Sequence, residues 1–505
     1  VLILGAGETV VSVLLATSLF EHNWLAYTVS WLVCLLVGCG LVLWRGLRCA
    51  EGVRGAADWP AAKLAAGCAA VSALHLMTLW NMDTNMRLNL SALRLEAGAM
   101  AVAAAPPRPP DHENAAFLYE KAFVLMKRIN DTDPGWTSLR QPNKWYSNLN
   151  KRDYNVKDPE LRRFLKAHEP TLTLLRRAAA MQGCCFERDY AHISLDMQLP
   201  ELSQLRQSAR LLAADARCKA ADGQVRAALE NVAAIQSISQ HLGSEPILIS
   251  GLVCVAIDSL ATETFEGILV STQPIAADLA ALPWDETVSF QRILHRTLVG
   301  EEAFGLSAFA LLSAEGRGSD AMPRELGFDE KFAGSFPGQL FRVYLLPDDV
   351  AGYRRQMREM RDSAAQGFQE AQARFPKLED EQRAKRPGIL SGMLLPVLTH
   401  SCQSFARAEA RHRLGRLALA VATFRAKTGQ LPAKLEGLVP EYIAEVPLDP
   451  YDDKPLRLVS HPAGIILYSI GPDLTDDGGT KEFDSATGKG DIVFRIGDVP
   501  GKGDK

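Results

Sequence analysis

The chain has 505 residues, which is long enough for about two to four domains that each bury a core of their own. Its 55 Lys and Arg residues and 59 Asp and Glu residues give a net charge of -4, so no overall basic field indicates nucleic acid as a partner. Hydrophobic residues make up 47% of the chain, as in soluble proteins, but they are unevenly spread along it.

Three apolar stretches crowd into the beginning of the chain, and each approaches the roughly 20 residues that span a bilayer. They lie at residues 1–20, 25–44 and 61–80. Arg45, Arg48 and Arg54 follow the second stretch, whereas the loop after the first stretch has no Lys or Arg. The positive-inside rule then makes residues after about 81 extracytoplasmic. Residues 1–80 are therefore predicted to form about three transmembrane helices in a bacterial inner membrane, with membrane lipid as a partner; the alternative is a water-soluble helical hairpin.

Residues 81–110 are predicted to form a helix that leaves the membrane, followed by a linker in which successive prolines favour an extended chain. Residues 111–400 read as a helical extracytoplasmic domain, either an irregular bundle or a helical repeat. Within it, Asp158 and Pro159 are an N-cap and a first-position proline, which open a helix that runs to about residue 181. Further helices are predicted at 201–221, 224–242, 246–269, 289–312 and 348–374, with a long loop at 315–339.

The predicted helix at 246–269 is apolar enough to suggest a fourth membrane span. Asp258, Glu263 and Glu266 recur through it, however, and ionisable groups inside a bilayer are costly. This segment is therefore predicted to be a buried core helix.

The sequence contains no P-loop, HExxH, GxSxG or kinase signature. Glu301 and Glu302 are an adjacent acid pair in an apolar helix, but neighbours on a helix point about 100° apart, so we expect at most one to face the core. Cys184 and Cys185 lie near Arg188, whose charge is offset by acidic neighbours, so they are predicted to be structural thiols. A disulfide from one of them to Cys218 remains open, because nothing in the spacing demands it.

Residues 401–497 have the pattern of a small α+β domain with an antiparallel sheet, and residues 498–505 form a tail. A helix up to Thr428 places Leu414, Leu417, Val421 and Phe424 on one face. Three strands are predicted after it, at 456–459, 465–470 and 492–496, and the last alternates apolar residues as a half-buried strand does.

An acidic, glycine-rich loop joins the last two predicted strands. It carries Asp473, Asp476, Asp477, Glu482, Asp484 and Asp491. A loop of this length inside a compact domain is usually functional or tied down. Calcium would cancel the repulsion between the carboxylates, and the glycines permit the tight turns that bring backbone carbonyls onto an ion. The alternative is a solvated acidic loop without an ion.

The order of motifs in residues 403–497 resembles the periplasmic domain of the major pseudopilin of type II secretion systems. The matching residues are Gly429 and Pro432, Leu435 and Leu438, Pro447 with Asp449 and Pro450, Tyr468 and Ser469 with Gly471 and Asp473, Gly478 and Gly479, and Asp491 with Ile492. The resemblance implies a helix laid on a small sheet and a structural calcium ion in the loop. Asp473 and Asp491 occupy matching positions, and Asp476, Asp477 and Asp484 are candidate ligands because they lie nearby.

A pseudopilin has a single N-terminal helix that continues into this domain, whereas residues 81–400 intervene in this chain. The layout is similar to multi-span bacterial membrane proteins that end in such a module. The fold is thus predicted to be mainly α, with transmembrane helices, a helical extracytoplasmic domain and the C-terminal α+β module.

The function predicted from the sequence is that of a membrane-anchored protein of the cell envelope, with a non-catalytic interaction or structural role. Its expected partners are membrane lipid and other envelope proteins, and not nucleic acid. Two alternatives remain: a secretion-system component, and an envelope hydrolase with its site in the helical domain. A deep polar pocket there, lined by His, Glu or Asp with a strongly shifted pKa, would favour the hydrolase.

Overall fold

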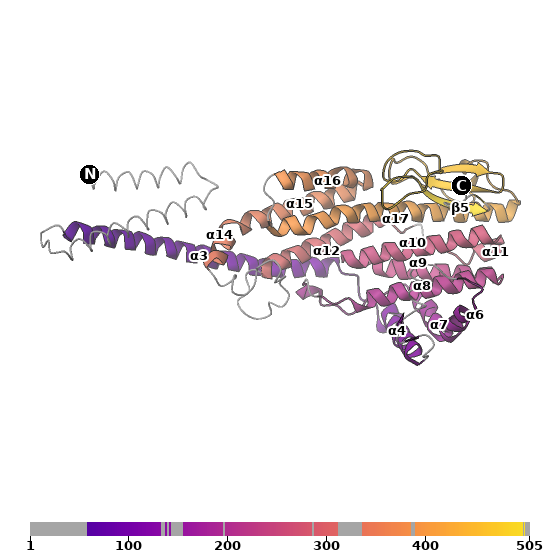
Figure 1. Cartoon of the computed structure of the whole chain (residues 1–505), viewed down its shortest axis with the longest axis horizontal. Coiled ribbons are helices and arrows are strands. Elements are labelled where there is room, and N and C mark those ends of the chain that lie inside the picture. Colours follow the sequence, from indigo (N-terminus) through magenta and orange to yellow (C-terminus); the bar gives the residue numbers. More distant parts are fainter. Residues whose placement is uncertain are drawn as a thin grey trace. The chain divides into compact units, whose positions relative to one another are not determined.

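A computed structural model describes most of the chain beyond residue 57. The described residues are 58–132, 137–138, 141–142, 155–194, 197–284, 287–311, 336–384, 389–497 and 499. They are mainly helical, with a small three-stranded antiparallel sheet near the C-terminus, as the sequence predicts (Figure 1). Contacts between residues divide the chain into two compact units. One comprises Val1–Arg94 and Ala308–Gly352, and the other comprises Leu95–Ser307 and Tyr353–Lys505.

The elements of the described residues follow in this order along the chain. The α-helices are α3 (Asp58–Ala104), α4 (Ala115–Thr132), α6 (Pro159–Ala167), α7 (Glu169–Ala179), α8 (Pro200–Ala221), α9 (Val225–Gly243), α10 (Leu248–Ser271), α11 (Ala276–Leu279), α12 (Phe290–Leu311), α14 (Phe336–Tyr344), α15 (Leu346–Gln366), α16 (Phe368–Ala384) and α17 (Ile389–Thr428). The 3-10 helices are η1 (Asp111–Glu113), η2 (Tyr190–His192) and η5 (Leu435–Leu438). The strands are β1 (Thr137–Ser138), β2 (Gln141–Pro142), β3 (Arg457–His461), β4 (Gly464–Ser469) and β5 (Ile492–Gly497).

In the first unit, a buried ion pair joins α3 to α14. Arg342 Nε donates to Asp83 Oδ1 at 2.7 Å, and the two side chains are 2% and 5% exposed. Earlier on α3, Leu74, Met77 and Trp80 are 62%, 64% and 67% exposed. These three residues belong to the third predicted membrane span, at 61–80, and α3 continues without a break through the predicted exit helix. The predicted spans at 1–20 and 25–44 lie outside the described residues.

One helix in the described part of the chain, α10, is long and apolar enough to cross a membrane by length and composition alone. Of its most apolar window, 67% is buried inside the protein. Helices α8, α9 and α17 and strand β5 pack around it. It is therefore a core helix of the second unit, as its recurring acidic residues predict.

Two segments that are each predicted to form a single helix are divided into two helices in the structure. The Asp158 side chain caps α6 by accepting the Glu160 N–H at 2.8 Å, as predicted, but the expected run to residue 181 splits into α6 and α7. Pro170 lies at the start of α7 and has no N–H to continue the ladder of α6. The predicted helix at 348–374 breaks at Gly367, whose φ of 140° is open mainly to glycine. The last residues of the predicted loop at 315–339 form the start of α14.

The C-terminal sheet lies against α17 and α10 within the second unit (Figure 1). Helix α17 ends at Thr428, and the following Gly429 has a φ of 76° and donates its N–H to the Arg425 carbonyl at 2.8 Å. Strands β3, β4 and β5 follow in antiparallel order, within two residues of their predicted positions. Leu414, Leu417 and Val421 of α17 are buried beneath them, as the helical pattern predicts.

The sheet shares its core with the helical part of the second unit. The Phe494 ring of β5 lies 5.8 Å from that of Phe265 on α10. Next to it, the Arg495 N–H donates to Glu266 Oε1 at 2.9 Å, and the Arg495 guanidinium lies 3.3 Å from the same oxygen. Helix α10 therefore joins α17 as a second support for the C-terminal module.

Candidate functional site

The acidic loop between β4 and β5 is tied together by its own carboxylates. Asp491 is fully buried and accepts the Gly479 N–H at 2.7 Å and the Asp477 N–H at 3.4 Å. Asp473 accepts the Gly490 N–H at 3.0 Å from the opposite side of the loop. Gly479 and Gly490 have φ values of 71° and 98°, so glycine permits the backbone turns that aim these amides.

The structure separates the five predicted calcium ligands into two sets. Asp476 lies beside β3 and β4, where it accepts from the Tyr468 hydroxyl at 3.1 Å and pairs with Arg457 at 3.3 Å. Asp484 caps its own turn by accepting the Ala486 N–H at 3.0 Å. The loop brings the other three, Asp473, Asp477 and Asp491, around a single lysine.

That lysine is Lys481, whose Nζ lies 2.8 Å from Asp477 Oδ1. The hydrogen bond to Asp477 raises the pKa of Lys481, and the charges of Asp477, Asp473 and Asp491 raise it further. The ammonium thus compensates part of the negative charge that the sequence predicts calcium to cancel. In this arrangement, no group of three or more His, Cys, Asp or Glu side chains in the described part of the chain is placed to hold a metal ion.

The buried carboxyl of Asp491 is costly to ionise. Burial raises its pKa to about 6, and the charges of Asp476 and Asp477 act in the same direction. The N–H groups of Gly479 and Asp477 oppose this shift because they stabilise the carboxylate. A cation near Asp491 would relieve the cost of ionising it.

Asp449 is a site residue whose role the sequence does not reveal, although it belongs to the matching motif. It is fully buried, and its carboxylate accepts from the Ser469 hydroxyl at 2.9 Å and from the Ile470 N–H at 2.9 Å. It also accepts the Tyr451 N–H at 3.1 Å and pairs with Arg457 at 3.0 Å. Asp449 therefore fixes the end of β4 to the segment before β3.

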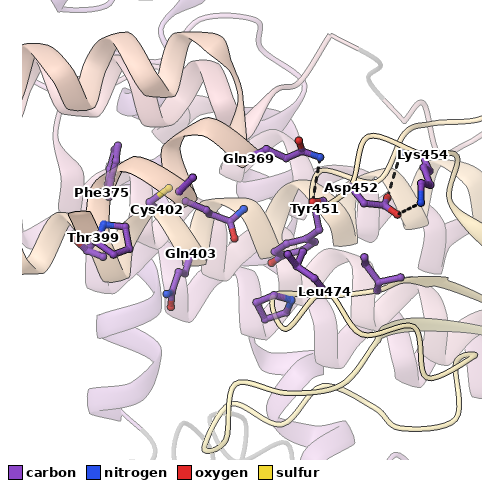
Figure 2. Close-up of a pocket in the computed structure, with 14 residues that line it drawn as sticks. Gln369, Phe375, Thr399, Cys402, Gln403, Tyr451, Asp452, Lys454 and Leu474 are labelled. Carbon is purple, nitrogen blue, oxygen red and sulfur yellow. Dashed lines mark hydrogen bonds and ion pairs between the residues drawn. The ribbon is translucent and has the colours of Figure 1, made fainter. Parts of the chain in front are cut away.

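A cavity of about 640 Å³ lies next to this junction, between α16, α17 and two loops of the C-terminal module (Figure 2). Its wall is formed by Gln369, Gln372, Ala373, Phe375, Pro376, Thr399, Cys402, Gln403, Tyr451, Asp452, Lys454, Ile470, Pro472 and Leu474. Gln369 Nε2 donates to the Tyr451 carbonyl at 3.2 Å, which holds α16 to the loop (Figure 2). Burial raises the pKa of the Cys402 thiol to about 12, so this cysteine is not an activated nucleophile.

His412, one of the buried histidines of the helical part, belongs to a structural network. His412 Nδ1 lies 3.1 Å from Asp258 Oδ1, and Trp284 Nε1 donates to His412 Nε2 at 3.2 Å. Both ring nitrogens therefore have partners, and none of the three residues lines the cavity of Figure 2. A smaller cavity of about 210 Å³ beside α10 and α17 is lined without His, Asp or Glu.

The cysteines likewise show structural surroundings. Cys184, Cys185 and Cys218 are free thiols, so the disulfide left open by the sequence is not formed in the structure. Burial raises the pKa of the Cys184 thiol. Arg188 pairs with Glu201 at 2.6 Å and with Glu245 at 2.7 Å, so its charge is already compensated by these carboxylates.

Comparisons with known proteins do not identify a function for this chain. No protein family model, no curated protein and no solved structure matches the chain.

Proposed function

We propose that this chain is a membrane-anchored protein of the bacterial cell envelope with a non-catalytic interaction role. Its N-terminal helices hold it in the inner membrane, and the residues after about 81 lie outside the cytoplasm. The three apolar stretches and the arginines at 45, 48 and 54 support this orientation. The exposed apolar side chains of Leu74, Met77 and Trp80 on α3 are consistent with a helix that meets lipid or another protein.

The observation that carries the interaction role is the arrangement of the C-terminal module. A three-stranded antiparallel sheet lies on α17, and the acidic loop joins its last two strands. This is the arrangement that a pseudopilin-like module requires, and pseudopilins act through contacts with other proteins. The polar groups described above serve as loop ties, ion pairs and helix contacts, so their geometry supports a binding role better than catalysis.

The orientation can be tested by protease accessibility of the full chain in its membrane. With a tag at the C-terminus, protease added to intact spheroplasts should remove the tag, whereas a tag in the loop around residue 50 should survive until the membrane is lysed. A C-terminal tag that is protected in intact spheroplasts would contradict the proposed orientation. A cytoplasmic protein and a periplasmic protein of known location serve as controls for lysis and for protease activity.

Calcium in the acidic loop is the second part of the proposal, and it depends on displacement of Lys481. The Lys481 ammonium pairs with Asp477, and the carboxylates of Asp473 and Asp491 act on it electrostatically, so calcium would have to displace the lysine and draw the three carboxylates together. Calcium binds oxygen ligands of this kind, and at a concentration of 100 times its Kd it would stabilise the folded chain by about 2.7 kcal/mol.

Thermal melting of the detergent-solubilised full chain provides the test. We expect calcium to raise the midpoint by a few degrees over chelator, and to raise it further in the variant Lys481→Gln, where no ammonium competes. The effect should shrink as the pH falls from 7 to 5, because protonation of Asp491 near pH 6 competes with the ion.

Magnesium at the same concentration is the control for ionic strength. If calcium and chelator give the same midpoint in both proteins, Lys481 is the resident counter-charge of the loop and the calcium proposal is wrong. That result would leave the membrane orientation untouched.

A further inference from the structure

The cavity of Figure 2 contains two buried hydroxyl groups that the protein itself does not satisfy. Tyr451 and Thr399 are 3% and 8% exposed, and neither Tyr451 Oη nor Thr399 Oγ1 has a hydrogen-bond partner in the described part of the chain. Leaving a buried hydroxyl unpaired costs about 1–3 kcal/mol. Burial raises the pKa of Tyr451, so its phenol stays protonated and can donate.

Helix α16 contributes a backbone acceptor next to the cavity. Pro376 is inside α16 and has no N–H, so the carbonyl of Gln372 lacks the donor that an α-helix normally supplies four residues later. Gln372 and Pro376 both line the cavity. The site therefore combines two unpaired hydroxyl groups with a helix carbonyl that lacks its usual donor four residues later.

The remaining wall is apolar and carries no net charge. Its apolar residues are Ala373, Phe375, Pro376, Ile470, Pro472 and Leu474. The charged residues are Asp452 and Lys454, which lie 3.9 Å apart and offset each other, while Asp452 also pairs with Arg457. An uncharged ligand fits these surroundings better than an ion, because a charged group would lose its hydration without gaining a counter-charge.

Leu474 at the cavity wall is held in an unusual backbone conformation. Its φ is 56°, in the left-handed region that non-glycine residues seldom adopt, and its side chain is 62% exposed. Strained backbone of this kind persists where the surrounding structure enforces it, and it concentrates at binding sites. This backbone conformation leaves the apolar side chain of Leu474 exposed to water at the cavity, where a bound ligand would cover it.

The aromatic residues argue against a sugar. Carbohydrates are bound largely by stacking on open aromatic faces, but Phe375 is fully buried and Tyr451 is 3% exposed. A peptide group, in contrast, offers a carbonyl to the hydroxyls and an N–H to the helix carbonyl. The volume of about 640 Å³ lies within the range of small-ligand sites.

We propose that this cavity binds a short, uncharged peptide segment of a partner protein, whose carbonyls accept from Tyr451 and Thr399 and whose apolar side chain packs on Leu474. This deepens the proposed interaction role, and it rests on that role. Because the charges of Asp452 and Lys454 offset each other, the wall favours an internal segment of a polypeptide over a free peptide, which would bring charged termini.

The test is calorimetric titration of the purified full chain in detergent with tetrapeptides of alanine and leucine. One arm uses peptides with acetylated and amidated ends, and a second arm uses the same sequences with free ends. We expect the blocked peptides to bind with a Kd below about 10 mM and the free-ended peptides to bind at least about tenfold more weakly. Maltotriose provides the sugar arm and should not bind.

Two variants assign the binding to this cavity. Tyr451→Phe removes one oxygen atom and should weaken the blocked peptides about three- to tenfold without lowering the melting temperature, because the hydroxyl has no protein partner. Ala373→Trp, at an exposed position of α16, should fill the cavity and abolish binding. The matched control Tyr442→Phe removes a hydroxyl from a tyrosine of the same module that does not line the cavity, and it should bind as the original chain does.

The proposal is overturned if no blocked peptide binds at about 10 mM, if free-ended peptides bind as tightly, or if Tyr451→Phe and Ala373→Trp bind unchanged. A drop in melting temperature for Tyr451→Phe alone would also count against it, since it would mean that the hydroxyl is satisfied without a ligand. These outcomes concern the purified chain, so they are separate from the protease test of membrane orientation.

Discussion

Replacing Arg342 by methionine should loosen the contact between α14 and α3 by about 3 kcal/mol. The change leaves the Asp83 carboxylate buried and deprived of the guanidinium that donates to both of its oxygens, at 2.7 Å and 3.3 Å. Arg87 stays 2.9 Å from Asp83 and keeps part of the compensation, so we expect the lower end of the range for broken buried pairs. Amide hydrogen exchange of α14 should then be about a hundredfold faster.

A double variant isolates the effect of leaving one charge buried without its partner. Asp83→Leu combined with Arg342→Met removes both charges, and it should recover most of the lost protection because no unpaired charge remains. Arg354→Met is the matched control: it breaks an ion pair with Glu96 whose side chains are 34% and 44% exposed, and it should cost at most about 1 kcal/mol. Equal exchange in Arg342→Met and Arg354→Met would show that the buried pair has no special weight.

The sequence predicts most elements of the fold because each carries its own periodicity. The strands at 456–459, 465–470 and 492–496 appear as β3, β4 and β5, since alternation of apolar residues marks a half-buried strand. The helix breaks at Pro170 and Gly367 are missed because a proline or a glycine is also compatible with a continuous helix pattern. The pairing of Asp83 with Arg342 spans 259 positions, so no local pattern indicates it.

The candidate site is predicted less completely, because the sequence shows which charges exist but not which ones meet. Spacing identifies the acidic loop, yet it does not reveal that Asp476 pairs with Arg457 or that Lys481 lies against Asp477. The cavity of Figure 2 is assembled from α16, α17 and two loops, and its hydroxyls are ordinary residues in the sequence. These hydroxyls become candidates for binding only because the structure shows that they are buried and have no hydrogen-bond partner in the described part of the chain.

Glu301 is another residue whose surroundings the sequence does not reveal. The acid pair at 301 and 302 is visible in the sequence, but its two environments are not. Glu302 is 6% exposed and pairs with Arg361 at 3.1 Å. Glu301 pairs with no arginine of the described residues, and its carboxylate accepts the Leu248 N–H at 3.3 Å. Burial raises the pKa of Glu301 to about 7, and the Leu248 N–H opposes this rise.

Replacing Glu301 by glutamine should therefore stabilise the chain strongly at pH 8 and much less at pH 5. The folded pKa of about 7 exceeds the ordinary value of 4.5, so folding takes up a proton between these values and stability falls as the pH rises from 4.5 through 7. At pH 8 the accumulated cost of ionising Glu301 is about 3 kcal/mol, at 1.36 kcal/mol per pKa unit. Glutamine keeps an oxygen that can accept from Leu248 and carries no charge, so it avoids this cost.

Urea unfolding of the full chain at both pH values measures the effect. The difference between Glu301→Gln and the original chain should grow from about 1 kcal/mol at pH 5 to about 3 kcal/mol at pH 8. Glu230→Gln makes the same chemical change on α9, where the carboxylate is 50% exposed and pairs with Arg226, and its difference should be small at both pH values. If Glu301→Gln and Glu230→Gln respond alike, the carboxyl of Glu301 is hydrated in the folded chain, and burial does not govern its ionisation.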